Sequence, residues 1–515
     1  MTSNPAAAVR MLVIYSLCIP LAALVGWMLT DQLDYGTLGF FGLIAALLGS
    51  PLIIRYHYGL MVLGLSAPIY CFFLQGNPPL WQVVVLLSLG VAVIDRTLNS
   101  DKRFLSVPVM TWPMLFVVAV TLMTAELTGG IGLKALGGGT GGGKKYISIL
   151  IGVATYFALT SRVIPKEKRK LFIGLFFLSG LPAFVGDLFP LLPSPLNYVN
   201  LLIPPTGVNG TDTEVSLGTT RLGAFSATAS TIVTYLLVRH GLRGIFTINH
   251  PLRLLLFLVM FALTLLGGFR TVMISYIAIF TLLFFLERLY RTQMLLVVVF
   301  GLLVGAVVVV PFADKLPRTF QRAVSFIPGI KVDAEVAADA EGSKKWREDI
   351  WRDTWPKVPQ YLLLGKGYGL SVEDFTMMGD GTFSNQHLID NSENSLAISG
   401  DYHNGPLSTL MPFGVWGAIA YLWMAGASMF VLYRNFRYGD PELKTVNAYL
   451  LAACLYCIFG FCFVFGGYSD APGFFARFAG FSIALNWCVC GPKKQMRVTQ
   501  RINKTPLSPA QPQPA

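Results

Sequence analysis

The feature that most constrains this chain is a series of long apolar segments, separated mostly by short polar connections. About fourteen such segments can be counted, and most approach the roughly 20 residues that an α-helix needs to cross a bilayer. Their bounds are 11–29, 36–54, 58–75, 81–95, 105–125, 146–161, 171–187, 222–238, 252–268, 271–287, 293–312, 407–433, 447–467 and 472–490. The sequence therefore predicts an all-α polytopic membrane protein with about 12–14 transmembrane helices.

Composition supports a membrane protein and argues against other classes. Charged residues make up only 13% of the chain, whereas soluble domains carry about 25%. The net charge of +12 does not indicate nucleic-acid binding, because the basic residues lie largely between the apolar segments. All seven cysteines lie in or beside apolar segments, which favours buried thiols over a disulfide framework or a zinc site.

Along the chain, basic connections alternate with others, among them 31–34, 75–80 and 468–473, that contain no lysine or arginine. The basic set contains Arg55; Arg96, Lys102 and Arg103; Arg162 to Lys170; Arg239 and Arg243; Arg288 and Arg291; Arg434, Arg437 and Lys444; and the tail beyond residue 491. Because basic connections stay in the cytoplasm, we expect both termini there. No clean small-residue cleavage site follows the first apolar run, so we expect a retained first span rather than a removed signal peptide. The same rule places the connections 188–221, 268–270 and 313–405 on the opposite, extracytoplasmic face.

This topology divides the chain into four parts. Residues 1–187 hold N-terminal transmembrane helices, 188–435 form a core that includes the extracytoplasmic loop 313–405, 436–490 hold C-terminal transmembrane helices, and 491–515 form a cytoplasmic tail. The glycine-rich stretch 129–143 reads as a flexible connector rather than a phosphate-binding loop, because no Gly-Lys-Ser/Thr follows it.

The loop 313–405 carries two local patterns. Residues 344–355 (KKWREDIWRDTW) predict a short helix, in which Trp346 pairs with Ile350 and Trp351 with Trp355 along a broad apolar face. Residues 365–369 (GKGYG) predict a tight turn.

Three basic residues stand out because the topology places all of them at one face of the membrane. Arg221 precedes the segment 222–238, Arg270 lies in the short turn before 271–287, and His403 ends the long loop. A single arginine at such a position is equally consistent with snorkelling to lipid headgroups. Two guanidinium groups together are suited to bind a diphosphate, and an imidazole can transfer a proton near neutral pH.

The other histidines have less distinctive positions. His57, His240 and His250 lie at expected cytoplasmic ends of spans, and His387 lies in the middle of the long loop. An isolated loop histidine is more often a surface residue than a catalyst, because catalysis needs positioned partners. His403 is the exception because Tyr402 and Asn404 flank it at a loop–span junction.

In these residues the chain resembles the O-antigen ligase and O-antigen polymerase family of bacterial membrane glycosyltransferases. Family members show two basic residues at mid-chain spans, then a long extracytoplasmic loop with an Arg-x-x-x-Trp helix, a Gly-x-Gly turn and a terminal His-Asn before a Gly-x-x-Gly span. The corresponding positions here are Arg221, Arg270, Arg347 with Trp351, Gly365 with Gly367, His403 with Asn404, and Gly414 with Gly417. The resemblance covers roughly residues 215–435. The chain departs from the family at Gly405-Pro406 and at 226–229 (SATA).

The resemblance implies a GT-C-like enzyme of the bacterial inner membrane, acting in O-antigen or exopolysaccharide biosynthesis as a polymerase or a ligase. It would transfer a glycan from an undecaprenyl-diphosphate donor to a hydroxyl of a glycan or lipid acceptor on the extracytoplasmic face. The catalytic residues would be Arg221 and Arg270, which neutralise the leaving diphosphate, and His403, which deprotonates the acceptor. The substrate-binding residues would be Asn404, Tyr402, Arg347 and Trp351.

No metal or cofactor is expected, since no cluster with ligand spacing lies near these residues. The expected partners are the lipid-linked glycan, the acceptor, membrane lipids and other polysaccharide assembly proteins, but not nucleic acid. Two alternatives stay open: a flippase for polyprenyl-linked oligosaccharides and a protein O-oligosaccharyltransferase. A flippase should carry basic residues deep within its spans, where this chain has few apart from Arg477.

Overall fold

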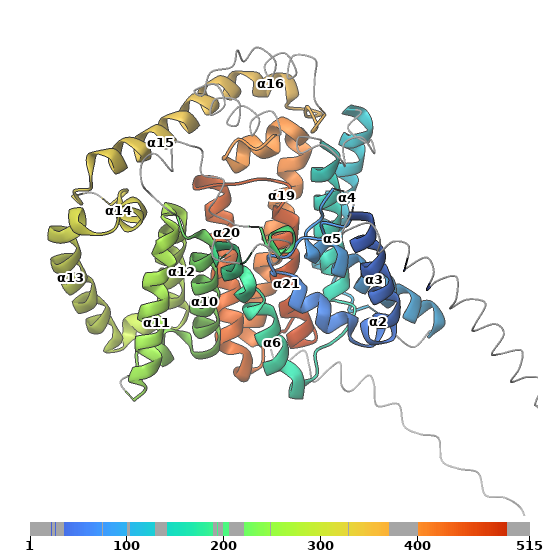
Figure 1. Ribbon diagram of the computed structural model, residues 1–515, viewed down its shortest axis with the longest axis horizontal. Helices are drawn as coiled ribbons and strands as arrows, with labels where there is room; N and C mark the ends of the chain where they lie inside the picture. The colour runs from blue at the N-terminus through green and yellow to red at the C-terminus, as the bar shows by residue number, and fades with distance from the viewer. Residues whose placement is uncertain are drawn as a thin grey trace, which may run out of the picture.

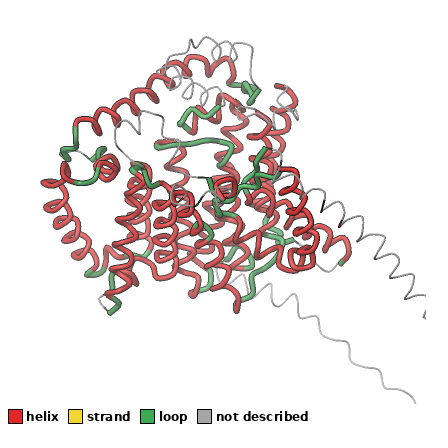
Figure 2. Tube along the Cα trace, viewed as in Figure 1, coloured by secondary structure: helices red, strands yellow, loops and turns green. Residues whose placement is uncertain are grey.

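The computed structural model describes residues 35–74, 76–99, 104–128, 142–188, 199–204, 221–247, 249–327, 329–369 and 400–491, with 22, 26 and 193 singly. Within these ranges the chain is helical and has no β-strand beyond one isolated bridge between Tyr70 and Pro79 (Figure 2). Several expectations concern residues outside these ranges. They are those for the first span, the stretch 129–141, most of the 188–221 loop, His387 and the tail after residue 491.

The α-helices are α2 (Tyr35–Gly64), α3 (Leu80–Leu98), α4 (Pro108–Thr128), α5 (Gly142–Leu159), α6 (Arg169–Leu178), α7 (Val185–Leu188), α8 (Val199–Leu202), α10 (Gly223–Ile245), α11 (Pro251–Thr264), α12 (Arg270–Leu286), α13 (Met294–Phe312), α14 (Arg318–Val324), α15 (Ala334–Thr354), α16 (Val358–Tyr361), α19 (Gly405–Tyr438), α20 (Lys444–Phe463) and α21 (Ala471–Asn486). Short 3₁₀ turns adjoin several of them, such as η6 (Leu265–Gly267) and η9 (Trp355–Lys357).

Six helical stretches of the described chain are long and apolar enough to cross a membrane. They are Leu80–Leu98, Pro108–Thr128, Lys166–Leu188, Met294–Lys315, Gly405–Tyr438 and Pro441–Phe463. Two shorter apolar stretches, Pro251–Gly267 and Arg270–Leu286, lie between them in the sequence. The chain is therefore an all-α polytopic membrane protein, as its hydropathy pattern predicts.

One predicted boundary is wrong. The segments 36–54 and 58–75 are not two spans joined at Arg55, because α2 runs unbroken from Tyr35 to Gly64 and the described residues from there to Pro79 form no helix. An exposed arginine interrupts a hydropathy pattern but breaks no backbone hydrogen bond, so the helix continues through it. Tyr58 anchors α2 by donating a 2.9 Å hydrogen bond to the Leu159 carbonyl at the end of α5.

The bundle is built around the three C-terminal helices. Figure 1 shows α19, α20 and α21 at the centre, with α10 to α12 on one side and α2 to α5 on the other. Helix α5 packs along α21 so closely that a Cβ on Gly152 would lie 2.8 Å from the backbone nitrogen of Gly473. Such small residues let transmembrane helices approach where no hydrophobic force drives them together.

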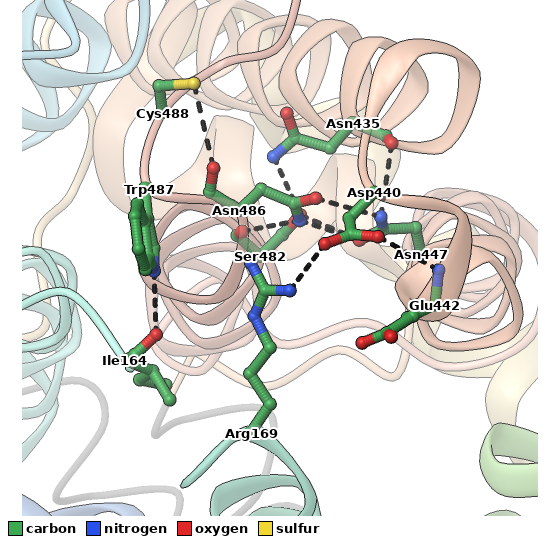
Figure 3. A network of polar contacts seen from close by, with 10 residues as sticks. All are labelled: Ile164, Arg169, Asn435, Asp440, Glu442, Asn447, Ser482, Asn486, Trp487 and Cys488. Atoms are coloured by element: carbon green, nitrogen blue, oxygen red, sulfur yellow. Dashed lines mark hydrogen bonds and ion pairs between the residues drawn. The ribbon is translucent and has the colours of Figure 1, made fainter. Parts of the chain in front are cut away.

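A buried polar network fixes the ends of these helices (Figure 3). Its side chains are Asn435 on α19, Asn447 on α20, and Ser482 and Asn486 on α21, joined by hydrogen bonds of 2.9 to 3.4 Å. Beside it, Arg169 at the start of α6 forms a 2.6 Å ion pair with Asp440, which follows α19. These contacts hold the end of α19 that lies far from Gly405.

The long loop folds over the opposite end of the bundle. In Figure 1, α15 runs across the top of the molecule from α14 to α16, which contacts α19. The predicted helix 344–355 is confirmed, and it begins earlier, at Ala334, where the Asp333 side chain accepts a hydrogen bond from the Glu335 amide. Trp355 does not share the buried face with Trp351, because it begins the η9 turn and is 48% exposed.

Candidate functional site

A backbone clasp joins the long loop to α19. The predicted turn is present, with φ of 75° at Gly365 and 72° at Gly367. The Gly367 amide donates a hydrogen bond to the Pro412 carbonyl (2.9 Å), and the Lys366 amide donates one to the Met411 carbonyl (2.7 Å). Those carbonyls are available because α19 is interrupted at Gly414, where φ is 59°. A Cβ on Gly365 would overlap the Pro412 carbonyl, so glycine is required by both conformation and space.

The residues around His403 hold the start of α19. The Asn404 side chain caps that helix by accepting a 3.1 Å hydrogen bond from the Leu407 amide. The Tyr402 amide donates to Ser408 Oγ (3.1 Å), and the Tyr402 ring is only 7% exposed. These contacts orient the His403 segment, and the expected substrate-binding role of Asn404 and Tyr402 stays a prediction.

Helix α15 is tied to the same segment by Trp351. Its indole nitrogen donates a 2.8 Å hydrogen bond to the Tyr402 carbonyl, and its ring packs against a small buried cluster that includes Val358, Leu407 and Met411. This contact positions the loop helix over the histidine. A sugar-binding role for Trp351 likewise stays a prediction.

His403 has a left-handed backbone conformation and an enclosed side chain. Its φ of 50° is left-handed, and its backbone amide donates to Asp401 Oδ1 (3.2 Å). The imidazole lies edge-on between the rings of Trp346 and Phe465, at centroid distances of 5.2 and 4.5 Å. Both ring nitrogens are buried, and neither has a hydrogen-bond partner among the residues that the structure describes. Buried polar atoms of this kind call for a partner.

The surroundings of His403 favour its neutral form. Burial lowers the pKa of the imidazole, the nearby Asp401 carboxylate raises it, and the Arg347 guanidinium lowers it again. An imidazole that is neutral at physiological pH can accept a proton, which is what a general base requires.

The structure places Arg221 and Arg270 at one end of the bundle, as the topology predicts. Arg270 begins α12 directly after the tight turn at Gly268, where φ is 65°. Arg221 precedes α10, and the next residue, Leu222, donates a 3.2 Å hydrogen bond to the Leu266 carbonyl in the η6 turn. The Arg221 guanidinium lies 5.8 Å from the centre of the ring of Phe269, the neighbour of Arg270.

Two further residues of the site, Arg322 and Asp339, are missed by sequence reasoning. Arg322 on α14 forms a 2.8 Å ion pair with Asp339 on α15, and their side chains are only 14% and 22% exposed. Burial raises the pKa of the Asp339 carboxyl, while the charges of Arg221 and Arg270 lower it. The Arg270 guanidinium also donates a 3.4 Å hydrogen bond to the carbonyl of Ala340, the residue after Asp339.

Arg347 lies between His403 and the arginine cluster, which consists of Arg221, Arg270 and Arg322. It lies eight residues after Asp339, on the same face of α15 and roughly 12 Å along the helix. Burial and the charge of Arg270 both lower the pKa of its guanidinium, and its buried Nε has no hydrogen-bond partner within the described ranges. The face of α15 toward the bundle therefore spans from the arginine cluster at one end to the imidazole at the other.

A second carboxylate, that of Asp470, lies near Asp401. Asp470, at the start of α21, has its carboxyl pKa raised by burial and by Asp401, and lowered by Arg477 and Lys145. The Arg477 guanidinium in turn lies 4.8 Å from the centre of the Trp81 ring. Among the residues the structure describes, no three metal-ligating side chains lie together.

Part of the chain matches a known protein family. Residues 255–422, about a third of the chain, match a family model described as O-Antigen ligase. This stretch of the chain is an O-antigen ligase domain. The ligase domain contains Arg270, Arg322, Asp339, Arg347 and His403, while Arg221 precedes it.

This domain match confirms the resemblance drawn from the sequence. It places the chain among membrane glycosyltransferases of the ligase and polymerase type. No curated protein matches the chain.

Proposed function

We propose that this protein transfers a glycan from undecaprenyl diphosphate to an acceptor hydroxyl, with His403 as the general base and Arg221 and Arg270 on the diphosphate. One observation carries the proposal. The inner face of α15 joins an arginine cluster to a buried imidazole whose nitrogens have no partner among the described residues. A diphosphate and a sugar hydroxyl are the groups that such a pair of subsites would bind.

The arginines supply the leaving-group chemistry. As the bond between the anomeric carbon and the diphosphate oxygen breaks, negative charge builds on that oxygen. Permanently charged guanidinium groups that are already in place stabilise this charge without reorganisation. Arg221 lies in the segment before α10 and Arg270 begins α12, so the diphosphate would be held from two sides.

His403 supplies the acceptor chemistry. The acceptor oxygen attacks the anomeric carbon and loses its proton to an imidazole nitrogen, while undecaprenyl diphosphate leaves with the bonding electrons. Because the pKa of His403 is lowered, the imidazole is neutral at neutral pH and can accept that proton. We expect the reaction to need no metal or cofactor.

The proposed location is the extracytoplasmic face of the bacterial inner membrane, with both termini in the cytoplasm. Three helices of the site, α10, α12 and α19, begin at the candidate site, next to Arg221, Arg270 and His403. Their opposite ends carry or adjoin basic residues, namely Arg239 and Arg243, Arg288 and Arg291, and Arg434 and Arg437. The positive-inside rule supports this orientation.

Purified protein in lipid nanodiscs tests the proposal with an undecaprenyl-diphosphate glycan and a glycan acceptor. Wild-type protein should form an elongated or ligated glycan and release undecaprenyl diphosphate. Arg270→Ala should lose donor binding, whereas His403→Ala should bind the donor and transfer nothing. Transfer by both variants at the wild-type rate would refute the assignment. Movement of intact donor across the bilayer without transfer would favour the flippase, and transfer to a protein hydroxyl would favour the O-oligosaccharyltransferase.

A further inference from the structure

Asp339 lies where an anionic ligand of the arginine cluster is expected. Its carboxylate is 2.8 Å from the Arg322 guanidinium, and it is close enough to Arg221 and Arg270 for both charges to act on it. These three arginines come from three separate elements: the segment before α10, the start of α12, and α14. Asp339 itself lies on α15, which runs above α12 in Figure 1.

The carboxylate has a physical reason to be there. Like charges brought together in a partly buried site repel one another, and a guanidinium that loses water needs an anion in exchange. A carboxylate presents two oxygens to the guanidinium fork, as a phosphate does. Asp339 therefore stabilises the cluster in the absence of a ligand.

We propose that the donor's diphosphate displaces Asp339 and takes Arg322 as a third arginine ligand. This inference rests on the proposed function, because it assigns the arginine cluster to the diphosphate. A diphosphate carries more negative charge and more acceptor oxygens than a carboxylate, so exchange at the cluster is favourable.

The exchange would change the position of α15 relative to His403. Asp339 and Arg347 lie on the same face of α15, and Arg347 acts on the imidazole. Release of Asp339 removes the Arg322 ion pair that holds this end of α15 to α14. Donor binding is thereby coupled to the position of the helix that covers the general base.

Binding of undecaprenyl diphosphate to the full-length protein in nanodiscs tests the displacement. Asp339→Asn should tighten binding by about tenfold, because the resident competitor is gone, and Arg322→Gln should weaken it by about tenfold. A purely structural ion pair predicts weaker binding in both variants, and that result would overturn the proposal. Asp339→Ser provides a second variant if the asparagine variant does not fold.

A matched control lies on the same two helices. Arg318 on α14 pairs with Glu335 on α15 at 2.9 Å, but these side chains are 37% and 55% exposed. Glu335→Gln should leave binding unchanged. If Arg270→Ala binds as tightly as wild type, the proposed donor site is wrong and the displacement falls with it. If Arg270→Ala loses binding while Asp339→Asn fails to tighten it, only the displacement is wrong.

Discussion

The indole nitrogen of Trp351 donates a 2.8 Å hydrogen bond to the carbonyl oxygen of Tyr402, the residue before His403. The loop helix α15 and the general base of the proposed reaction are thus joined by one direct contact. Because Trp351 also packs against the start of α19, it transmits the position of α15 to the imidazole.

Trp351→Phe should slow transfer while leaving donor binding unchanged. Phenylalanine keeps most of the packing but loses a hydrogen bond, which contributes about 1 kcal/mol, so a rate loss of about fivefold to tenfold is expected. The measurement is the transfer rate at saturating donor. Trp355→Phe is the control, because Trp355 is 48% exposed on the η9 turn. Equal rate losses in both variants would contradict a positioning role for Trp351.

The pH dependence of transfer should report the charges that face His403. The charges of Arg347 on α15 and of Asp401, two residues before His403, act directly on the pKa of the imidazole. Asp470 and Lys145 lie near Asp401 and form a second layer of charge. Trp346 and Phe465, which flank the ring, carry no charge. A base works when neutral, so activity should fall as the pH drops through the pKa of His403, which lies below its ordinary 6.5.

Asp401→Asn and Arg347→Gln should move the acidic limb of that profile in opposite directions. Loss of the Asp401 charge lowers the pKa of His403 and shifts the limb to lower pH, while the asparagine oxygen can still accept the His403 amide hydrogen bond. Loss of the Arg347 charge raises the pKa and shifts the limb to higher pH. Profiles of kcat/KM that coincide for all three proteins would contradict His403 as the titrating base.

The helical architecture and the candidate site residues at helix ends can be predicted from the sequence. Hydropathy identifies most helices, and charge alternation brings Arg221, Arg270 and His403 to one end of the bundle. The break at Gly414 and the extent of α2 are not accessible in this way, since both depend on backbone hydrogen bonds that hydropathy does not report.

Arg322 and Asp339 are missed for a different reason. The sequence predicts a loop helix that begins at residue 344, whereas α15 begins at Ala334, ten residues earlier. With that start, Asp339 and Arg347 fall on one broad helical face, to which residues spaced by four and eight contribute. The partner of Asp339 lies on another helix, and only the tertiary structure reveals it.

Gly365→Ala should destabilise the protein strongly. The added methyl group would meet the Pro412 carbonyl of α19, at a left-handed φ that alanine disfavours, for a cost above about 2 kcal/mol. Thermal unfolding in detergent measures the effect. Gly342→Ala on α15 is the control, because nothing lies within 4 Å of its added Cβ and alanine favours a helix. A Gly365→Ala protein as stable as wild type would refute the clasp.

Asp440→Asn should lower stability without changing the chemistry. Asp440 pairs with the Arg169 guanidinium at 2.6 Å, and that side chain is only 7% exposed, so removing the charge leaves a buried cation uncompensated (Figure 3). Breaking such a pair costs about 3 kcal/mol in buried sites, and less here because Asp440 is itself 27% exposed. The melting temperature should therefore fall, while donor affinity at low temperature stays at the wild-type value, because Asp440 follows the end of α19 remote from His403. Glu442→Gln, on an exposed neighbour, should change neither quantity. A loss of donor affinity in Asp440→Asn would show that this end of α19 is coupled to the site.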